Sequence, residues 1–186
     1  MGNQRLVPLR QELLSQASGV TLEVGFGSGA NLPFYSDRVT RLVGVEKEPA
    51  IARLSKGKRL RVDWEVKIGV AEKLPVETRS VDCVVTTLTI CSCADVFKTL
   101  QEIRRVLKPG GQYLFLEHGL SHDPNIQRWQ RRLTPLQKKL GCGCRLDRNI
   151  RGLLADACLE PSEVRSFYME KTPKVAGYMT IGRISL

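Results

Sequence analysis

The residues with the clearest chemical meaning lie in the stretch "TLEVGFGSGANLPFY", residues 21–35. It places three glycines at alternate positions, Gly25, Gly27 and Gly29, directly after a short apolar segment. Because glycine lacks a Cβ, such a turn can adopt positive φ and let a ligand approach the backbone. Glu23 lies just before the glycines, and Glu46 follows about 20 residues later. This pattern predicts a ligand-binding turn, with Glu46 able to accept hydrogen bonds from both hydroxyls of a ribose.

The identity of that ligand is open from the glycines alone. "GFGSGA" matches a variant of the dinucleotide fingerprint, so an NAD-binding protein remains an alternative. Three features favour another ligand. Glu23 puts a negative charge at a strand end, which suits a ligand carrying an ammonium or sulfonium group, and Gly29 is a glycine that the dinucleotide pattern does not need. The chain of 186 residues also leaves no room for a separate substrate domain.

An alternation of strands and helices is expected to position these residues. Apolar patterns predict strands over 20–24, 39–46, 60–68, 80–90 and 112–118, and helices over 5–16, 51–58, 96–107 and 149–159. Two further strands, in "EVRSFYME" and "VAGYMTIGRIS", are separated only by "KTPK" and must therefore form an antiparallel hairpin. The pattern predicts an α/β fold with a doubly wound parallel sheet, whose ligands bind beyond the carboxyl ends of the strands.

A basic segment interrupts this alternation. The net charge is +10, and residues 121–151 hold eight Arg or Lys against two Asp, a local excess of six. We expect residues 119–145 to form a lid with two short helices. Such a surface, carrying Trp129, could attract nucleic acid or an anionic membrane, or be an ordinary solvated face. A small-molecule partner is favoured, because stacking platforms for nucleic acid usually carry more than one aromatic.

Hydropathy indicates where in the cell the protein acts, and cysteine spacing indicates whether it holds a metal. No apolar run approaches the length of about 20 residues that a membrane span needs, and the first residues are polar, so we expect a cytoplasmic protein with reduced cysteines. Cys-x-Cys pairs occur at 91/93 and 142/144. Four thiolates could hold zinc, but this spacing is tighter than the Cys-x2-Cys of zinc knuckles. We therefore favour small core residues and expect no metal.

Five ordered motifs resemble a known family. "LEVGFGSG", "GVE", "GVAEKLP", "SVDCVV" and "LKPGGQYLFLEH" have the order and spacing of class I S-adenosylmethionine-dependent methyltransferases of the type eleven group. The resemblance implies one methyltransferase domain over 1–186, with an N-terminal helix in 1–18 and the lid at 119–145. It implies a Rossmann-like seven-stranded sheet in the order 3-2-1-4-5-7-6 with strand 7 antiparallel.

A narrower resemblance concerns the acceptor. "GANLPFY", "TTLTICSC", "LEHG" and "GCGCRLDRNI" are similar to small methyltransferase-like proteins related to the mammalian alkyl-thiol methyltransferases. This implies S-adenosylmethionine as cofactor and a small-molecule acceptor, whether a thiol, a quinone-like compound or another. The membrane anchor of the mammalian proteins is not expected here. Methylation of a lipid headgroup or RNA, and cofactor binding without transfer, are the alternatives.

The resemblance also assigns the site. The glycine turn packs on the methionine portion of the cofactor, Glu23 orients its ammonium, and Glu46 binds the ribose. The implied cofactor-binding residues are Glu23, Gly25, Phe26, Gly27, Gly29, Asn31, Glu46, Lys47, Val70, Ala71, Glu72, Thr87 and Leu88. Many relatives have Asp at the position of Val70, where it accepts from the adenine amino group. Here we expect Glu72 or a backbone carbonyl to replace it.

Methyl transfer from a sulfonium is an in-line displacement, in which the protein aligns the nucleophile and excludes water. A thiol is partly ionised near neutral pH, whereas an oxygen or carbon acid needs a base. His118, at the carboxyl end of the fifth predicted strand, is the candidate catalytic base, and local hydrogen bonding is its alternative role. His122 is a weaker candidate, and Asp147 and Arg148 are expected to close over the substrate.

Overall fold

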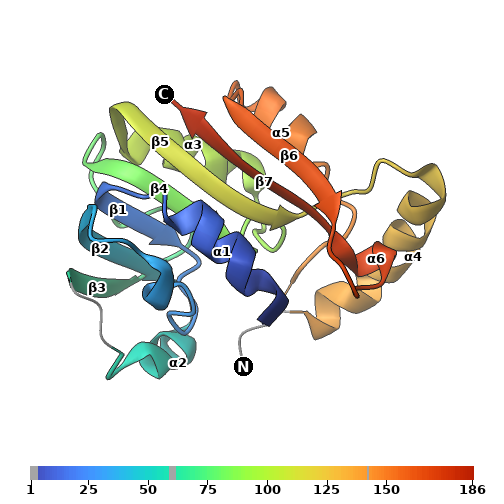
Figure 1. Cartoon of the computed structure of the whole chain (residues 1–186), viewed down its shortest axis with the longest axis horizontal. Helices are drawn as coiled ribbons and strands as arrows, with labels where there is room; N and C mark the ends of the chain where they lie inside the picture. Colours follow the sequence, from blue (N-terminus) through green and yellow to red (C-terminus); the bar gives the residue numbers. More distant parts are fainter. Residues whose placement is uncertain (1–3, 59–61, 142) are drawn as a thin grey trace.

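The seven strands form one sheet in the predicted order. The computed structural model describes residues 4–58, 62–141 and 143–186. The strands are β1 Gly19–Val24, β2 Val39–Glu46, β3 Asp63–Ile68, β4 Val81–Thr87, β5 Leu107–His118, β6 Glu163–Tyr168 and β7 Tyr178–Ser185. They lie in the order β3-β2-β1-β4-β5-β7-β6 (Figure 1). β7 runs antiparallel to both β5 and β6, which confirms the predicted terminal hairpin.

Helices lie on both faces of this sheet. The α-helices are α1 Val7–Leu14, α2 Pro49–Ala52, α3 Val96–Val106, α4 Pro124–Leu140, α5 Ile150–Asp156 and α6 Lys174–Gly177. Short 3-10 turns are η1 Gln4–Leu6, η2 Leu32–Phe34 and η3 Arg53–Ser55. In Figure 1, α1 crosses one face of the sheet while α3 and α5 lie behind it. None of the helices in the described ranges is long and apolar enough to cross a membrane.

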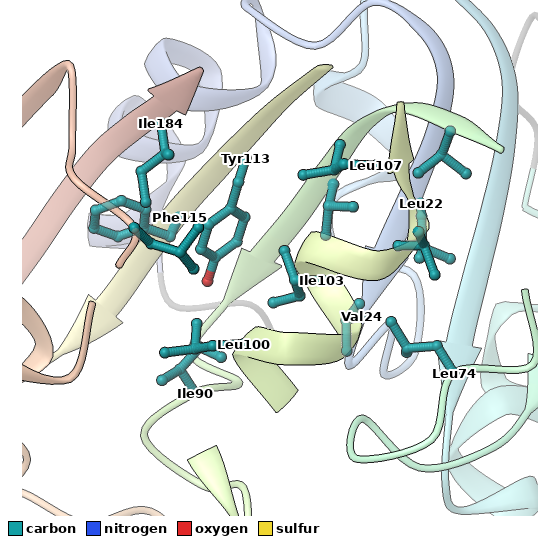
Figure 2. Close-up of a cluster of buried hydrophobic side chains, with 14 of the residues drawn as sticks. Leu22, Val24, Leu74, Ile90, Leu100, Ile103, Leu107, Tyr113, Phe115 and Ile184 are labelled. Carbon is teal, nitrogen blue, oxygen red and sulfur yellow. The ribbon is translucent and has the colours of Figure 1, made fainter. Parts of the chain in front are cut away.

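The alternation of side chains along each strand supplies a separate core to each face. On one face, Leu100 and Ile103 of α3 pack with Leu22 and Val24 of β1 (Figure 2). On the other face, α1 packs its leucines against residues of β5 and β7. Successive residues of a strand point to opposite faces, so β4 and β5 contribute to both cores. Burial on both faces explains why these strands are apolar nearly throughout.

The segment after β5 differs from the prediction. It holds one 17-residue helix, α4, instead of two short helices. Asp123 caps it by accepting from the amide of Asn125, and Pro124 fits the first turn, where its missing N–H has no helical partner. Pro135 lies inside the helix, which continues to Leu140, and the buried Gln130 ties the helix to the body of the protein. The side-chain Nε2 of Gln130 donates to the carbonyls of residues 119 and 175.

Other boundaries also shift. The helix predicted over 51–58 is reduced to α2 followed by η3, and the strand predicted over 80–90 ends at Thr87. β5 begins at Leu107, so the "KPGG" stretch belongs to it instead of preceding it. Residues 60 and 61 of the predicted third strand lie outside the described ranges.

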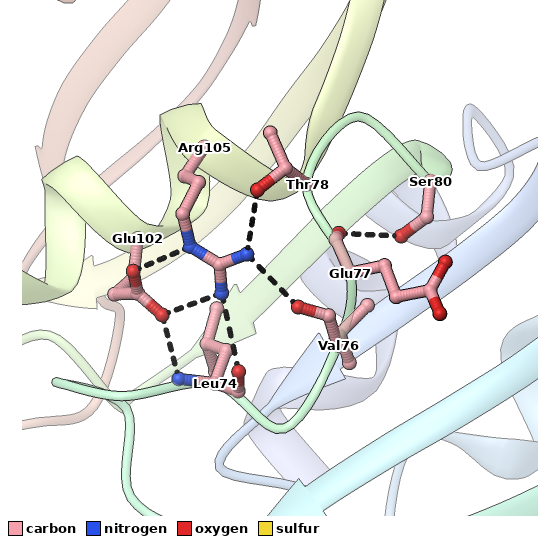
Figure 3. Close-up of polar contacts among 7 residues, drawn as sticks. All are labelled: Leu74, Val76, Glu77, Thr78, Ser80, Glu102 and Arg105. Carbon is pink, nitrogen blue, oxygen red and sulfur yellow. Dashed lines mark hydrogen bonds and ion pairs between the residues drawn. The ribbon is translucent and has the colours of Figure 1, made fainter.

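An arginine on α3 holds the loop between β3 and β4 (Figure 3). Arg105 donates from Nε and Nη2 to the two carboxylate oxygens of Glu102, at 2.6 and 2.7 Å. The same guanidinium donates to the carbonyls of Leu74 and Val76. Glu102 in turn accepts from the amide of Leu74 at 2.8 Å. This loop follows residues 70–72, so the clamp positions the predicted adenine side of the site.

We expect the substitution Arg105→Ala to lower the free energy of unfolding by about 2 kcal/mol, because several partly buried acceptors lose their donor. Arg105→Lys should recover only part of this loss, since an ammonium cannot make the two parallel bonds. Urea denaturation of each variant gives the measurement. Arg104→Ala, one residue earlier and exposed, is the control and should change the value by less than about 0.5 kcal/mol. Equal losses for Arg104→Ala and Arg105→Ala would contradict the assignment.

Candidate functional site

The glycine turn after β1 presents bare backbone to open space. Gly25, Gly27 and Gly29 have φ of 75°, 59° and 73°. A Cβ on Gly25 would lie 2.3 Å from Oγ1 of Thr89, and one on Gly29 would lie 2.8 Å from Cδ1 of Leu32. A Cβ on Gly27 would meet nothing nearer than the carbonyl oxygen of Gly25 at 3.9 Å. The outer glycines therefore serve the packing of the chain, while Gly27 leaves room for a ligand.

Glu46 joins this turn to the end of β2. Its side chain is 8% exposed, with Oε2 accepting from the amide of Gly27 at 2.9 Å and Oε1 accepting from the amide of Glu48 at 3.0 Å. An ionised carboxylate offers about four lone-pair positions, so two backbone donors leave acceptor capacity for further hydroxyl groups. The neighbouring Lys47 is exposed.

Glu23 is the centre of a buried polar network. Its carboxylate accepts from Nδ2 of Asn31 at 2.9 Å and from the hydroxyl of Tyr35 at 2.7 Å. Nδ2 of Asn31 also donates to Oγ1 of Thr87, and Arg10 donates to Oδ1 of Asn31. Burial raises the pKa of Glu23 to about 7, although both hydrogen bonds and Arg10 oppose this shift. The network links β1, the turn after it and the end of β4.

Arg10 and Tyr35 were not assigned to the site from the sequence. Arg10 lies on α1, and nothing in the local pattern indicates that this helix reaches Asn31. Phe26 is among the predicted cofactor-binding residues, but it is only 2% exposed. Its side chain stacks on Trp64, with ring centroids 5.7 Å apart. A Cβ on Gly44 would lie 2.5 Å from the Phe26 ring. Phe26 thus anchors the turn in the core, and only its backbone belongs to the surface of the turn.

The residues predicted to flank adenine lie at the end of β3. Val70 is 45% exposed and Ile68 is 52% exposed, so apolar surface is available there. Ala71 and Glu72 are partly buried. Oε1 of Glu72 accepts from the amides of Ala94 and Asp95, at 2.9 and 3.2 Å, and so holds the start of α3. The expected role of Glu72 as adenine acceptor stays a prediction.

The loop after β4 is strained and tied to a buried acid. Leu88 has a φ of 56°, which is unusual for a residue with a side chain and is often found at functional sites. Glu117 is fully buried, and its two oxygens accept from the amides of Thr89 and Cys91, at 3.1 and 3.2 Å. Burial raises the pKa of Glu117, and these backbone donors oppose the shift.

Glu117 was not predicted from the sequence as a site residue. The signal was present, because "QYLFLEH" places an acid inside an apolar strand, as "TLEV" does with Glu23. A charge in such a position is costly unless it is hydrogen-bonded, so it indicates a neighbouring loop with amides to satisfy.

His118 meets two thiols. Its Nδ1 lies 3.5 Å from Sγ of Cys144, which in turn lies 3.5 Å from Sγ of Cys91. The hydrogen bond between the two thiols raises the pKa of Cys91 and lowers the pKa of Cys144. The role of His118 as a base stays a prediction. Cys142 lies outside the described residues. His122 is exposed and packs against the rings of Tyr168 and Tyr178.

The basic segment divides into parts that contact the site and parts that do not. Arg148 donates to the carbonyls of Ile90 and Cys93, so it holds the loop after β4. Asp147 pairs with Arg145, with Oδ1 and Nε 3.1 Å apart. On α4, Trp129 is 54% exposed, and the Arg132 guanidinium lies 5.6 Å from its ring centroid. Binding of nucleic acid or an anionic membrane by this surface stays a prediction.

Comparisons with known proteins agree with this geometry. Residues 22–115, just over half of the chain, match the family described as "Methyltransferase domain". The chain is 29% identical to the thiol S-methyltransferase TMT1B of Homo sapiens, over 97% of this chain and 77% of that protein. It is 31% identical to the human thiol S-methyltransferase TMT1A, over 78% of this chain and 65% of that protein, just under two thirds of its length.

The solved structure of an S-adenosylmethionine-dependent methyltransferase from Mesorhizobium loti has the same fold. It superimposes with a TM-score of 0.74 at 12% identity, covering 100% of this chain and 99% of that one. At this identity the likeness concerns the arrangement of strands and helices.

The glycine turn predicts two different costs. Alanine at Gly25 or Gly27 forces a Cβ into a positive-φ position, at about 1–2 kcal/mol. Gly25→Ala adds a collision with Thr89, which should cost about 1–3 kcal/mol more. Urea denaturation should therefore show the larger loss of unfolding free energy for Gly25→Ala. Equal losses for the two variants would show that Thr89 does not confine Gly25.

Glu23 predicts a pH dependence of stability. Its pKa is about 7 in the folded chain, against 4.5 for an ordinary glutamate. The folded state therefore holds a proton that the unfolded state releases, and the free energy of unfolding falls as pH rises from about 4.5 to about 7. The difference between the wild-type and Glu23→Gln curves isolates this group, since Glu117 shifts in the same direction. A difference that stays constant with pH would disprove the raised pKa.

Proposed function

The chain belongs to the methyltransferase domain family, and we propose that it methylates the sulfur of a small-molecule thiol. It is an S-adenosylmethionine-dependent methyltransferase. S-adenosylmethionine supplies an activated methyl group on its sulfonium.

The observation that carries the proposal is the open side of Gly27 beside the Glu46 carboxylate. The position that a Cβ of Gly27 would occupy is empty to 3.9 Å, so a ligand can lie directly on the backbone there. Glu46 already orients that backbone through the amide of Gly27 and retains acceptor capacity for the two ribose hydroxyls. At the end of β3, exposed Ile68 and Val70 offer apolar surface to the adenine ring. These residues fit the cofactor from ribose to base.

The methionine portion is assigned to the other side of the turn. Glu23 lies there with Asn31 and Thr87, in a network that crosses from β1 to β4. A positively charged ammonium nearby favours the ionised form of Glu23, which offsets the cost of burying this carboxylate. We assign to Asn31 the orientation of that carboxylate, and to Leu88 the strained wall beside the methyl group.

A thiol acceptor is supported by two considerations. The human relatives TMT1A and TMT1B are both thiol S-methyltransferases by name. A thiol of ordinary pKa is already partly ionised near neutral pH, so the chain needs only to align it and exclude water. In the structure, Nδ1 of His118 faces Cys144, so this nitrogen is engaged by a protein thiol. A carbon or oxygen acceptor would depend on a base far more strongly.

The proposal is tested with labelled methyl transfer to four acceptor classes: small alkyl thiols, phenols, quinone precursors and phospholipids. We expect a methyl thioether and an equal amount of S-adenosylhomocysteine from the thiols, with turnover at least about tenfold above the other classes. Glu46→Gln should raise the KM for the donor by about tenfold, because it weakens charge-assisted hydrogen bonds. Glu48→Gln, whose side chain is exposed, is the matched control and should leave that KM unchanged.

Methylation of only a phenol, a quinone precursor or a phospholipid would overturn the thiol acceptor while leaving the cofactor site in place. Thermal stabilisation by NAD but not by S-adenosylmethionine would overturn the cofactor site itself.

A further inference from the structure

The structure joins one cysteine from each Cys-x-Cys pair to a histidine. Sγ of Cys91, Sγ of Cys144 and a ring nitrogen of His118 all lie within 4.8 Å of one another. Cys91 follows β4, His118 ends β5 and Cys144 follows α4, so three separate segments meet at this Cys91–His118–Cys144 cluster. The sequence pattern favoured small core residues over a zinc site of four thiolates, because Cys-x-Cys is tighter than the Cys-x2-Cys of zinc knuckles.

Two of the three separations between these atoms are close to the edges of a metal tetrahedron, and the third is within 4.8 Å. With Zn–S bonds of about 2.3 Å and Zn–N bonds of about 2.0–2.1 Å, tetrahedral geometry puts two sulfurs about 3.8 Å apart and a sulfur and a nitrogen about 3.6 Å apart. The observed separations are 3.5 Å for Cys91 to Cys144 and 3.5 Å for Cys144 to His118. The third separation, between Cys91 and His118, lies within 4.8 Å, so side-chain adjustments are enough to place all three atoms around one ion.

The backbone around the cluster is already fixed. The amide of Cys91 donates to the buried Glu117, and its carbonyl accepts from the amide of Arg145 at 2.9 Å. Arg148 donates to the carbonyls on either side, those of Ile90 and Cys93. Outer contacts of this kind hold metal ligands in position before the ion binds. The cluster is also closed to solvent on its sulfur side, since Cys91 is 0% exposed and Cys144 is 7% exposed.

We propose that Cys91, His118 and Cys144 bind one zinc ion, with a water molecule completing the tetrahedron. Two sulfurs and an imidazole nitrogen form a ligand set that zinc prefers, and two thiolates balance its charge. Zinc uptake displaces the thiol protons to solvent. The ion fastens the segment 143–148 to the ends of β4 and β5, at the carboxyl edge of the sheet. This assignment is independent of the acceptor, so it survives if the thiol proposal fails.

The zinc content of the full chain, purified without a metal-binding tag, tests the proposal. We expect about one zinc ion per chain by mass spectrometry and a loss of at least about tenfold in Cys91→Ser, Cys144→Ser and His118→Gln. Cys93→Ser and Cys158→Ser are the matched controls, because these cysteines lie outside the cluster. Both controls should retain the metal. An equal loss of zinc in the controls would overturn the assignment.

Reconstitution with cobalt(II) provides a readout that does not depend on the yield of folded variants. The wild-type chain and Cys93→Ser should both develop thiolate-to-cobalt charge-transfer absorption, and zinc should abolish it by displacement. Added zinc should also raise the melting temperature of chelator-treated protein. A wild-type chain that gives neither signal would overturn the proposal. Binding of copper(I) but not zinc would also overturn the proposal. A disulfide between Cys91 and Cys144 in place of zinc uptake would overturn it as well.

Discussion

The carboxyl edge of the sheet depends on carboxylates that accept hydrogen bonds from loop amides. Glu46 accepts from the glycine turn and from the residue that precedes α2, while Glu117 accepts from the loop after β4. Glu72 does the same for the start of α3. Loops that pack this closely cannot leave their amides unpaired, and an ionised acceptor forms the stronger bond. The edge is therefore rigid where its backbone must face a ligand.

This constraint also explains the distribution of glycine and strain. Gly25 and Gly29 are required because Thr89 and Leu32 occupy the space beside them, whereas the space beside Gly27 is open, as the proposed cofactor site needs. Leu88 accepts a positive φ since its amide is held by the carbonyl of Leu116. The same edge receives the end of the basic segment, where Arg148 reaches back to the loop after β4. The edge that we propose binds the methyl donor is thus completed by residues far along the chain.

Several site features could be predicted from local sequence because each follows from residues close together in the chain. A strand followed by a turn was enough to predict the roles of the alternate glycines, of the acid before them and of the acid at the end of β2. The network around Glu23 could not be predicted in the same way. Arg10 approaches Asn31 only because α1 packs across the sheet, and Cys91 approaches Cys144 only because α4 folds back.

What the sequence by itself determined is the alternation of strands and helices, the terminal hairpin and the position of the glycine turn. Local geometry suffices for these, since side-chain period and backbone freedom act within a few residues. Tertiary structure alone decided that the basic segment forms one helix and that two cysteine pairs contribute one thiol each to a cluster with His118. Gln130 bonds to the carbonyl of Val175, and Cys91 contacts Cys144. Both contacts join residues that are far apart in the sequence, so no local pattern predicts them.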